Sequence, residues 1–245
     1  MIADEKRQCP SRPQAWPDRS RHGSCPHRQR RDGLVRSAGE LLATPDWAAK
    51  MVRQTWHMLP GLIPFLFWIH PHTDPLSDAF RWISLGVAGT VSLIVFVRIQ
   101  GVLRPSEGRG GEAVLGYALC VLGTLWMFPE HGELGMTVLA VLAFGDGMAT
   151  IGGTALRSSQ LPWNRQKSWA GTMSFVFFAA PLATLVYWGD ARPAVPLATA
   201  AACGIAASLA GAAAESLPGQ RLNDNIRVGL AAAAAVAVTH HLLVG

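Results

Sequence analysis

Three carboxylates, one lysine and one arginine lie in or beside apolar segments of the chain, where side chains from distant positions can meet. They are Asp146, Glu215, Asp224, Lys167 and Arg53. Carboxylate oxygens are ligands that Mg²⁺ prefers, with phosphate oxygens and water completing its octahedron. Lys and Arg offset the negative charge that develops on a transferred phosphoryl group. These residue types together suit the binding of a nucleotide triphosphate with magnesium.

Asp146 stands out because it lies between Gly145 and Gly147 inside an apolar run. An Asp at the centre of a membrane helix costs about 2.5 to 3.5 kcal/mol, so its ionised form needs a partner, a cavity or a function. The two glycines would let another backbone, a metal or a phosphate approach the carboxylate. A glycine-rich packing face with a hydrogen-bonded Asp explains the same residues, and the sequence leaves both interpretations open.

Several polar neighbours accompany these five residues, namely His57, Ser168 and Asn225. Taken alone, His57 fits a residue at a membrane interface, and residues 223–225 fit a turn, because Asn and Asp favour such bends. Glu215 fits equally well as a charge at a helix end. No Gly-x-x-x-x-Gly-Lys-Ser/Thr loop occurs in the sequence, which argues against a soluble P-loop nucleotide-binding domain.

The composition indicates an all-α, polytopic membrane protein. The 245 residues are 50% hydrophobic and only 15% charged, whereas soluble domains carry about a quarter of charged residues. The sequence pI of about 9.4 comes mainly from the amino-terminal region and loops, and it suits anionic lipid headgroups rather than a nucleic acid.

Seven apolar segments approach the roughly 20 residues that a membrane-spanning helix needs. They are 56–70, 80–99, 113–128, 134–156, 170–188, 194–214 and 227–244. The first is short and interrupted by Pro60 and Pro64, and the third is short as well, so either segment can be tilted, kinked or re-entrant. We expect about seven transmembrane helices.

Lysine and arginine are concentrated in alternate loops, which predicts the orientation because cytoplasmic loops are rich in both residues. The amino terminus is expected in the cytoplasm and the carboxyl terminus outside. The candidate functional residues, together with Glu112, then all lie toward the cytoplasmic side. The acidic residues of the outer loops are expected to be solvated charges: Asp74, Asp78, Glu130, Glu133 and Asp190.

The chain divides into a basic tail at residues 1–49 and a membrane domain at residues 50–245. The first 33 residues have no apolar signal-peptide core, so we expect a disordered tail or an over-long gene start, with initiation near Val35 or Met51. Cys9, His22, Cys25 and His27 in this tail are a weak candidate for a metal cluster. Cys120 and Cys203 are expected to be buried small hydrophobic residues.

The ordered set of polar motifs resembles the polyprenol kinase family, which includes phytol, farnesol and dolichol kinases and the CTP-dependent diacylglycerol kinases. The resemblance extends over about residues 50 to 240 and rests on the following motifs: Arg53-Gln-Thr-Trp-His57 with Gly61, Glu112, Gly145-Asp146-Gly147 with Gly152, Lys167-Ser168 with Gly171, Glu215-Ser-Leu-Pro218, and Asn223-Asp224-Asn225-Ile226. No single motif is decisive for the resemblance, but the ordered set of motifs is a strong signal.

The resemblance implies an enzyme that transfers the terminal phosphate of a nucleotide, typically CTP, to the hydroxyl of a membrane isoprenoid or lipid alcohol. It implies that Asp146 and Asp224 bind Mg²⁺, with Glu215 as a third ligand or as the base near the alcohol. It further implies that Lys167 and Arg53 contact phosphates. His57, Ser168 and Asn225 would orient their neighbours, and Gly145 and Gly147 would line the nucleotide site.

The chain departs from the family pattern at three positions. Ala170 stands where the family usually has Glu, Asn223 replaces the first Asp of an Asp-Asp-Asn triplet, and Gly229 replaces a common Pro. If the missing Glu normally helps to hold metal or activate the alcohol, this chain would be slow, altered in specificity or inactive.

Two other functions fit parts of the sequence. A CDP-diacylglycerol synthase also uses CTP, Mg²⁺ and a lipid, but its usual Lys-Asp, His-Gly-Gly and Asp-Arg signature is missing. A transporter could bind a cation or proton at Asp146, but no inverted repeat is visible and the polar residues gather at one side rather than at the midplane. The sequence allows a homodimer without requiring one.

Overall fold

The structure is a computed structural model, and it describes residues 45–68, 77–79, 82–83, 86–87, 90, 110–219 and 223–245. The described residues form one helical unit, in which an isolated bridge between Gln160 and Ser168 is the single β feature described. The predicted all-α class is therefore confirmed for this part of the chain. The proposed metal cluster in the tail and most of the predicted span 80–99 lie outside the described residues.

The helices follow one another as α3 (Pro45–Met58), a 3-10 turn η1 (Leu59–Leu62), α4 (Ile63–Phe67), α6 (Gly110–Met127), α7 (Gly132–Ala140), a π-helix η3 (Val141–Asp146), α8 (Gly147–Ala155), α9 (Trp169–Asp190), α10 (Leu197–Ser216) and α11 (Asp224–Leu243). The π-helix continues from α7 without a break and passes directly into α8, so these three elements form one long helix.

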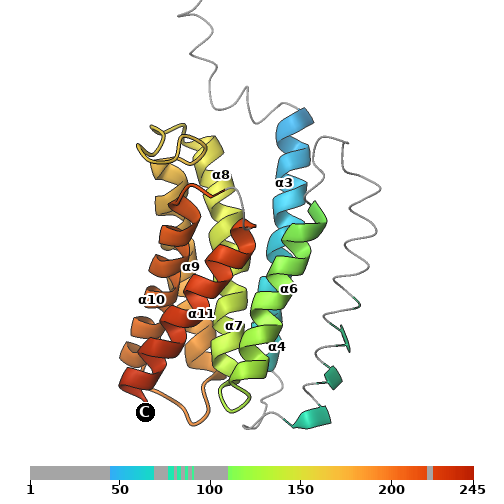
Figure 1. Cartoon of the computed structure of the whole chain (residues 1–245), viewed down its shortest axis with the longest axis vertical. Helices are drawn as coiled ribbons and strands as arrows, with labels where there is room; N and C mark the ends of the chain where they lie inside the picture. Colours follow the sequence, from blue (N-terminus) through green and yellow to red (C-terminus); the bar gives the residue numbers. More distant parts are fainter. Residues whose placement is uncertain are drawn as a thin grey trace, which may run out of the picture. The chain divides into compact units, whose positions relative to one another are not determined.

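This long helix is the core of the bundle (Figure 1). It packs against α9, α10 and α11 on one side and against α3 and α6 on the other. The most apolar stretch of Gly132–Ala155 is 78% buried, compared with 28 to 39% for the corresponding stretches of α9, α10 and α11. Val138, Val141 and Leu142 are fully buried, as expected for a helix that is apolar on all sides.

Four described helices are long and apolar enough to cross a membrane: Gly132–Ala155, α9, α10 and α11. They correspond to the predicted spans 134–156, 170–188, 194–214 and 227–244, which the structure bounds within a few residues. The predicted span 113–128 is present as a shorter apolar helix, Leu115–Met127. The predicted span 56–70 is instead the end of α3 followed by η1 and α4, with Pro60 at the start of the 3-10 turn. The total of seven spans stays a prediction.

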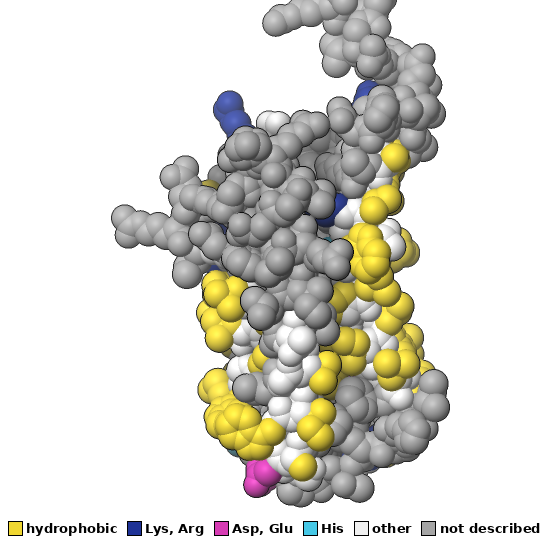
Figure 2. Space-filling model, turned by 90° about the vertical axis from the view of Figure 1, so that its right-hand side faces the viewer, with side chains coloured by type: hydrophobic (Ala, Val, Ile, Leu, Met, Phe, Trp, Pro, Cys, Tyr) yellow, Lys and Arg dark blue, Asp and Glu magenta, His cyan; other side chains and the backbone are white. Residues whose placement is uncertain are grey.

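Large apolar side chains cover the outside of the helices. Leu115, Phe177, Leu209 and Leu242 are all more than half exposed, and Figure 2 shows such side chains along the height of one face. A soluble protein rarely exposes an apolar surface of this extent, whereas lipid accommodates it. Together with the four long apolar helices, this surface identifies an integral membrane protein.

Close contact between α9 and α10 depends on Gly204. A Cβ atom built at Gly204 would lie 2.5 Å from the backbone nitrogen of Thr184 and 2.7 Å from its Cα. Because backbone atoms cannot move aside, Gly204→Ala is expected to lower the free energy of unfolding by about 1 to 3 kcal/mol, the usual cost of overpacking. Thermal unfolding in detergent would measure this. Gly123→Ala is the control, since nothing lies within 4 Å of its Cβ position, and it should not destabilise the protein.

Two of the acidic residues that were expected in solvent are buried, so that prediction is wrong for them. Glu133 is 2% exposed and Asp190 is 1% exposed, because the first turn of α7 and the last turn of α9 are covered by neighbouring parts of the bundle. Glu130 and Asp78 are exposed as expected, and Asp74 lies outside the described residues. Cys120 and Cys203 are buried, free thiols, as predicted.

Candidate active site

Lys167 joins two of the candidate carboxylates. Its Nζ lies 2.8 Å from Oε1 of Glu215 and 3.3 Å from Oδ2 of Asp224. These three residues come from the loop before α9, the last turn of α10 and the first residue of α11. The structure therefore brings together three candidate residues that are far apart in the sequence.

The loop between α8 and α9 holds Lys167 in place through its own backbone. The carbonyl oxygen of Lys167 accepts a hydrogen bond from the N–H of Leu161, and its N–H donates to the carbonyl of Asn164. Leu161 is 1% exposed and anchors the loop to the bundle. The Asn164 side chain donates to the carbonyl of Ser216 at 3.2 Å, as does the indole N–H of Trp163. These bonds fix the loop beside Glu215, so Lys167 is positioned by backbone geometry as well as by charge.

The first turn of α11 orients Asp224. Asn223 caps this helix, since its side-chain oxygen accepts a hydrogen bond from the N–H of Asn225 at 2.8 Å. Arg227, one turn along, forms an ion pair with Oδ1 of Asp224 and donates to the carbonyl of Leu217 at 3.0 Å. One oxygen of Asp224 therefore faces Arg227 and the other faces Lys167.

Asp146 is the last residue of the π-helix η3, and its partner is His57 on α3. His57 Nε2 lies 3.2 Å from Oδ2 of Asp146, and the His57 ring meets the Tyr117 ring edge-on at 5.3 Å. A π-helical turn inside an α-helix is often found at functional sites. Asp146 also interacts electrostatically with Lys167, Arg53 and Glu215, so the His57–Asp146 pair belongs to the same cluster as Lys167.

The charge of Lys167 is stabilised by this cluster. Burial alone would lower the pKa of the ammonium group, but Glu215, Asp224 and Asp146 more than offset it and leave the pKa above its ordinary value. The raised pKa keeps Lys167 protonated through neutral and mildly alkaline pH. The site therefore retains a permanent positive charge among three carboxyl groups.

Two helices begin at this cluster, α9 and α11. Ser168 caps α9, since its hydroxyl accepts a hydrogen bond from the N–H of Gly171 at 3.2 Å. The amino-terminal end of a helix carries about half a positive charge and attracts anions. Because Lys167 precedes Ser168 and contacts Asp224, both helix ends lie close to the lysine, and their dipoles add to its positive charge.

The glycines around Asp146 are tightly packed. A Cβ atom at Gly145 would lie 2.4 Å from the ring of Phe175, and one at Gly147 would lie 2.5 Å from Cγ of Met58. Gly153 and Gly171 bring α8 and α9 into close contact. Helix packing thus accounts for these glycines, and a role of Gly145 and Gly147 in phosphate binding stays a prediction.

Sequence reasoning did not single out Arg227 or Tyr117. Arg227 lies three residues after Asp224, on the same face of a helix, and this spacing could have indicated the ion pair. Tyr117 could not have been found, because its contact with His57 joins helices distant in sequence.

The side chain of Glu112 lies outside the described residues. Ala170, at the start of α9, donates its N–H to the Ser158 hydroxyl at 2.7 Å.

Curated proteins with similar sequences are kinases of isoprenoid alcohols. The chain is 32% identical to phytol kinase 1, chloroplastic, of Arabidopsis thaliana over 73% of its own length and 63% of that protein. It is 30% identical to a probable phytol kinase 1 of Glycine max, over 85% of its own length and 73% of that protein. Identity to the farnesol kinase of Arabidopsis thaliana is 24%, over 80% of this chain and 68% of that protein.

No protein-family profile matches the chain, and no solved structure matches it. The chain spans 63% of the length of the Arabidopsis phytol kinase, which is less than two thirds of that protein. The similarity to the Glycine max protein covers more of both chains, and with the ordered motifs around Asp146, Lys167 and Asp224 it establishes the relationship. The chain belongs to the polyprenol kinase family, the group that contains the phytol and farnesol kinases.

Proposed function

We propose that this protein is a lipid-alcohol kinase, which transfers the terminal phosphate of a nucleotide triphosphate to the hydroxyl of a membrane isoprenoid alcohol such as phytol. CTP is the proposed donor. The observation that carries the proposal is the cluster of Asp146, Glu215 and Asp224 around Lys167, in a chain whose similar proteins are phytol and farnesol kinases.

The donor atoms of this cluster fit a magnesium ion. All three acidic residues offer oxygen ligands, which Mg²⁺ requires. Oε2 of Glu215 is buried and has no hydrogen-bond partner among the described residues, so this oxygen is available to a cation or to a substrate hydroxyl. Asp146 and Asp224 are the proposed ligands, with Glu215 as a third. When bound, the ion would neutralise charge on the phosphates.

The side chains of the site have separate proposed tasks. Lys167 and Arg53 bind phosphate oxygens and hold the donor in place, which is the main contribution of a protein to phosphoryl transfer. Glu215 lies at the end of α10, and its free oxygen either binds the ion or accepts the proton of the attacking alcohol. His57 orients Asp146, Asn225 supports the first turn of α11, and Ser168 caps the first turn of α9 and so orients the residues beside Lys167.

The orientation of the protein in the membrane is also a proposal. The described lysine and arginine side chains near the site are Arg53, Arg157, Arg165, Lys167 and Arg227. In Figure 2, Lys and Arg side chains are visible toward one end and an acidic residue at the other. Since cytoplasmic ends are rich in Lys and Arg, the site and amino terminus would face the cytoplasm. Residues 50–245 would form the catalytic domain, and a homodimer is compatible with it.

A phosphate-transfer assay on purified protein in lipid nanodiscs tests the function. CTP, ATP and UTP labelled in the terminal phosphate would be offered with phytol, farnesol, a long polyprenol and diacylglycerol. We expect label on an isoprenoid alcohol, with release of CDP from CTP, and loss of transfer when EDTA removes Mg²⁺. If CTP is offered with phosphatidate instead, release of pyrophosphate would indicate a cytidylyltransferase. Activity that requires an ion gradient would indicate a transporter.

A further inference from the structure

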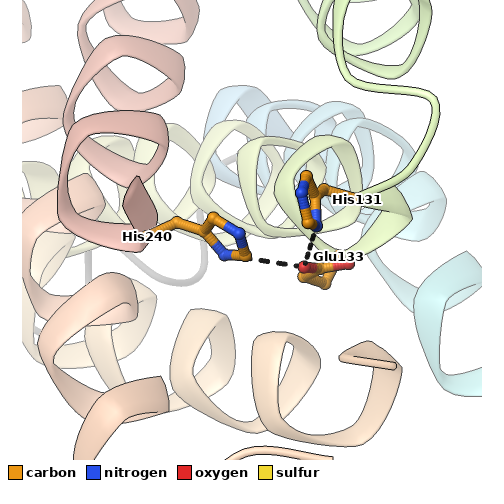
Figure 3. Close-up of side chains that lie close together, drawn as sticks. All are labelled: His131, Glu133 and His240. Atoms are coloured by element: carbon orange, nitrogen blue, oxygen red, sulfur yellow. Dashed lines mark ion pairs between the residues drawn. The ribbon is translucent and has the colours of Figure 1, made fainter. Parts of the chain in front are cut away.

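We propose that His131, Glu133 and His240 form a binding site for a divalent transition-metal ion of the zinc class, at the end of the bundle opposite the candidate active site. Figure 3 shows the three side chains pointing toward one another. His131 and Glu133 come from the start of α7, and His240 comes from the last turn of α11. One ligand atom of each residue lies within 4.8 Å of the other two.

The spacing of the donor atoms matches a metal site. Oε1 of Glu133 lies 3.3 Å from Nδ1 of His131 and 3.6 Å from Nδ1 of His240. Ligands bound tetrahedrally to zinc at about 2.0 to 2.1 Å stand about 3.3 Å from one another. Nδ1 of His240 also lies 2.6 Å from the Tyr187 hydroxyl, and this hydrogen bond would give way when the nitrogen binds the ion. All three ligand atoms lie within 4.8 Å of one another, so a small movement of the histidine rings would bring them around one ion.

The chemistry of these donors selects the kind of ion. Two imidazoles with one carboxylate suit zinc and related metals, whereas magnesium and calcium prefer oxygen ligands. Asp146 lies about 20 Å from Glu133 along the long helix, at 1.5 Å per residue. This site is thus distinct in position and in metal preference from the proposed magnesium site.

Helix-end electrostatics alone do not explain the cluster. An acidic residue in the first turn of a helix and a histidine in the last turn are each stabilised by the helix dipole. Neither residue has to be buried to gain this stabilisation. Here the side chain of Glu133 is 2% exposed and that of His240 is 8% exposed. The His131 side chain, 37% exposed, is the one that gives an ion access from the surface. A bound cation would stabilise the buried carboxylate between the two imidazoles.

Metal binding to the full chain would test this inference directly. The protein would carry Cys9→Ser and Cys25→Ser, so that the amino-terminal Cys and His residues do not contribute, and a purification tag without histidine. A chelator would first remove any bound metal. After Zn²⁺ is added back, we expect one Zn²⁺ per chain by elemental analysis and a raised Tm. With Co²⁺ in its place, we expect a visible d–d spectrum. An excess of Mg²⁺ should not displace the ion.

Variants assign the ion to this cluster. His240→Asn should weaken binding at least about 100-fold, the upper end of what loss of an outer partner costs a metal site. His241→Asn, the exposed neighbour in the same turn, should leave the affinity unchanged, as should Asp146→Asn. If His240→Asn does not fold, the half-exposed His131→Asn decides. An absence of stoichiometric binding by the wild type, or binding by the His131 and His240 variants as tight as that of the wild type, would mean a hydrogen-bonded cluster only and overturn the proposal. Neither result depends on whether the kinase assay succeeds.

Discussion

Asp146→Asn is expected to reduce phosphate transfer about 10³-fold, the size of effect seen when one electrostatic group is removed from a preorganised site. The substitution keeps the shape of the side chain and its contact with His57 at 3.2 Å. It removes the negative charge that Asp146 contributes beside Lys167 and Glu215, and with it a proposed magnesium ligand. The rate of transfer at saturating nucleotide and alcohol would measure the effect.

The control for Asp146→Asn is Glu130→Gln, which neutralises an exposed acid at the other end of the bundle and should retain full activity. Both variants should have a Tm near that of the wild type, since neither changes side-chain volume. If the carboxylate binds the ion directly, the Asp146 variant should need a higher Mg²⁺ concentration than the wild type for half-maximal activity. Activity within about tenfold of wild type would show that Asp146 is outside the catalytic machinery, and would favour its role as a packed, hydrogen-bonded residue.

Lys167→Met is expected to abolish activity and to lower the free energy of unfolding by about 3 kcal/mol. Removing one partner of a buried ion pair costs about 3 to 5 kcal/mol, because the other charge stays buried without compensation. Glu215 is 5% exposed, and Lys167 Nζ is 2.8 Å from its Oε1. Unfolding in detergent micelles, followed by circular dichroism, would measure the change.

A second substitution separates stability from catalysis at this pair. In Lys167→Met with Glu215→Gln the buried charge is gone, so most of the lost stability should return while activity stays absent. Arg165→Met, an exposed cation two residues earlier in the same loop, should change stability by no more than about 0.5 kcal/mol. Recovery of activity in the double variant would rule out a direct role of Lys167 in phosphate binding.

The parts of the fold that sequence reasoning predicted best are those set by simple hydrophobicity. The last four apolar segments became four long helices because each is apolar over about 20 residues, and two of them begin at capping residues, Ser168 before α9 and Asn223 before α11. The first segment differs, since Pro60 starts a 3-10 turn and the chain continues into the short α4. Proline interrupts a helix in a known way, but the geometry that follows depends on tertiary packing.

The candidate site was predictable as a set of residues and not as a geometry. Lys167, Glu215 and Asp224 could be assigned to one side of the membrane from the order of spans, and the structure places them in direct contact. Their pairing depends on the loop hydrogen bonds of Asn164 and Leu161, which no residue pattern encodes. The burial of Glu133 was missed for a similar reason, because it depends on α11 covering the first turn of α7.

The π-helix at residues 141–146 also separates the two ends of the longest helix. A π turn holds one residue more than an α turn, and one residue corresponds to about 100° of rotation in an α-helix. Side chains before and after η3 therefore follow different angular registers around the same axis. The half that carries Glu133 packs against α6, α9 and α11, while the half that follows Asp146 packs against α3 and α9. A single membrane-crossing helix can in this way present α11 with one set of side chains and α3 with another, while α9 contacts both halves.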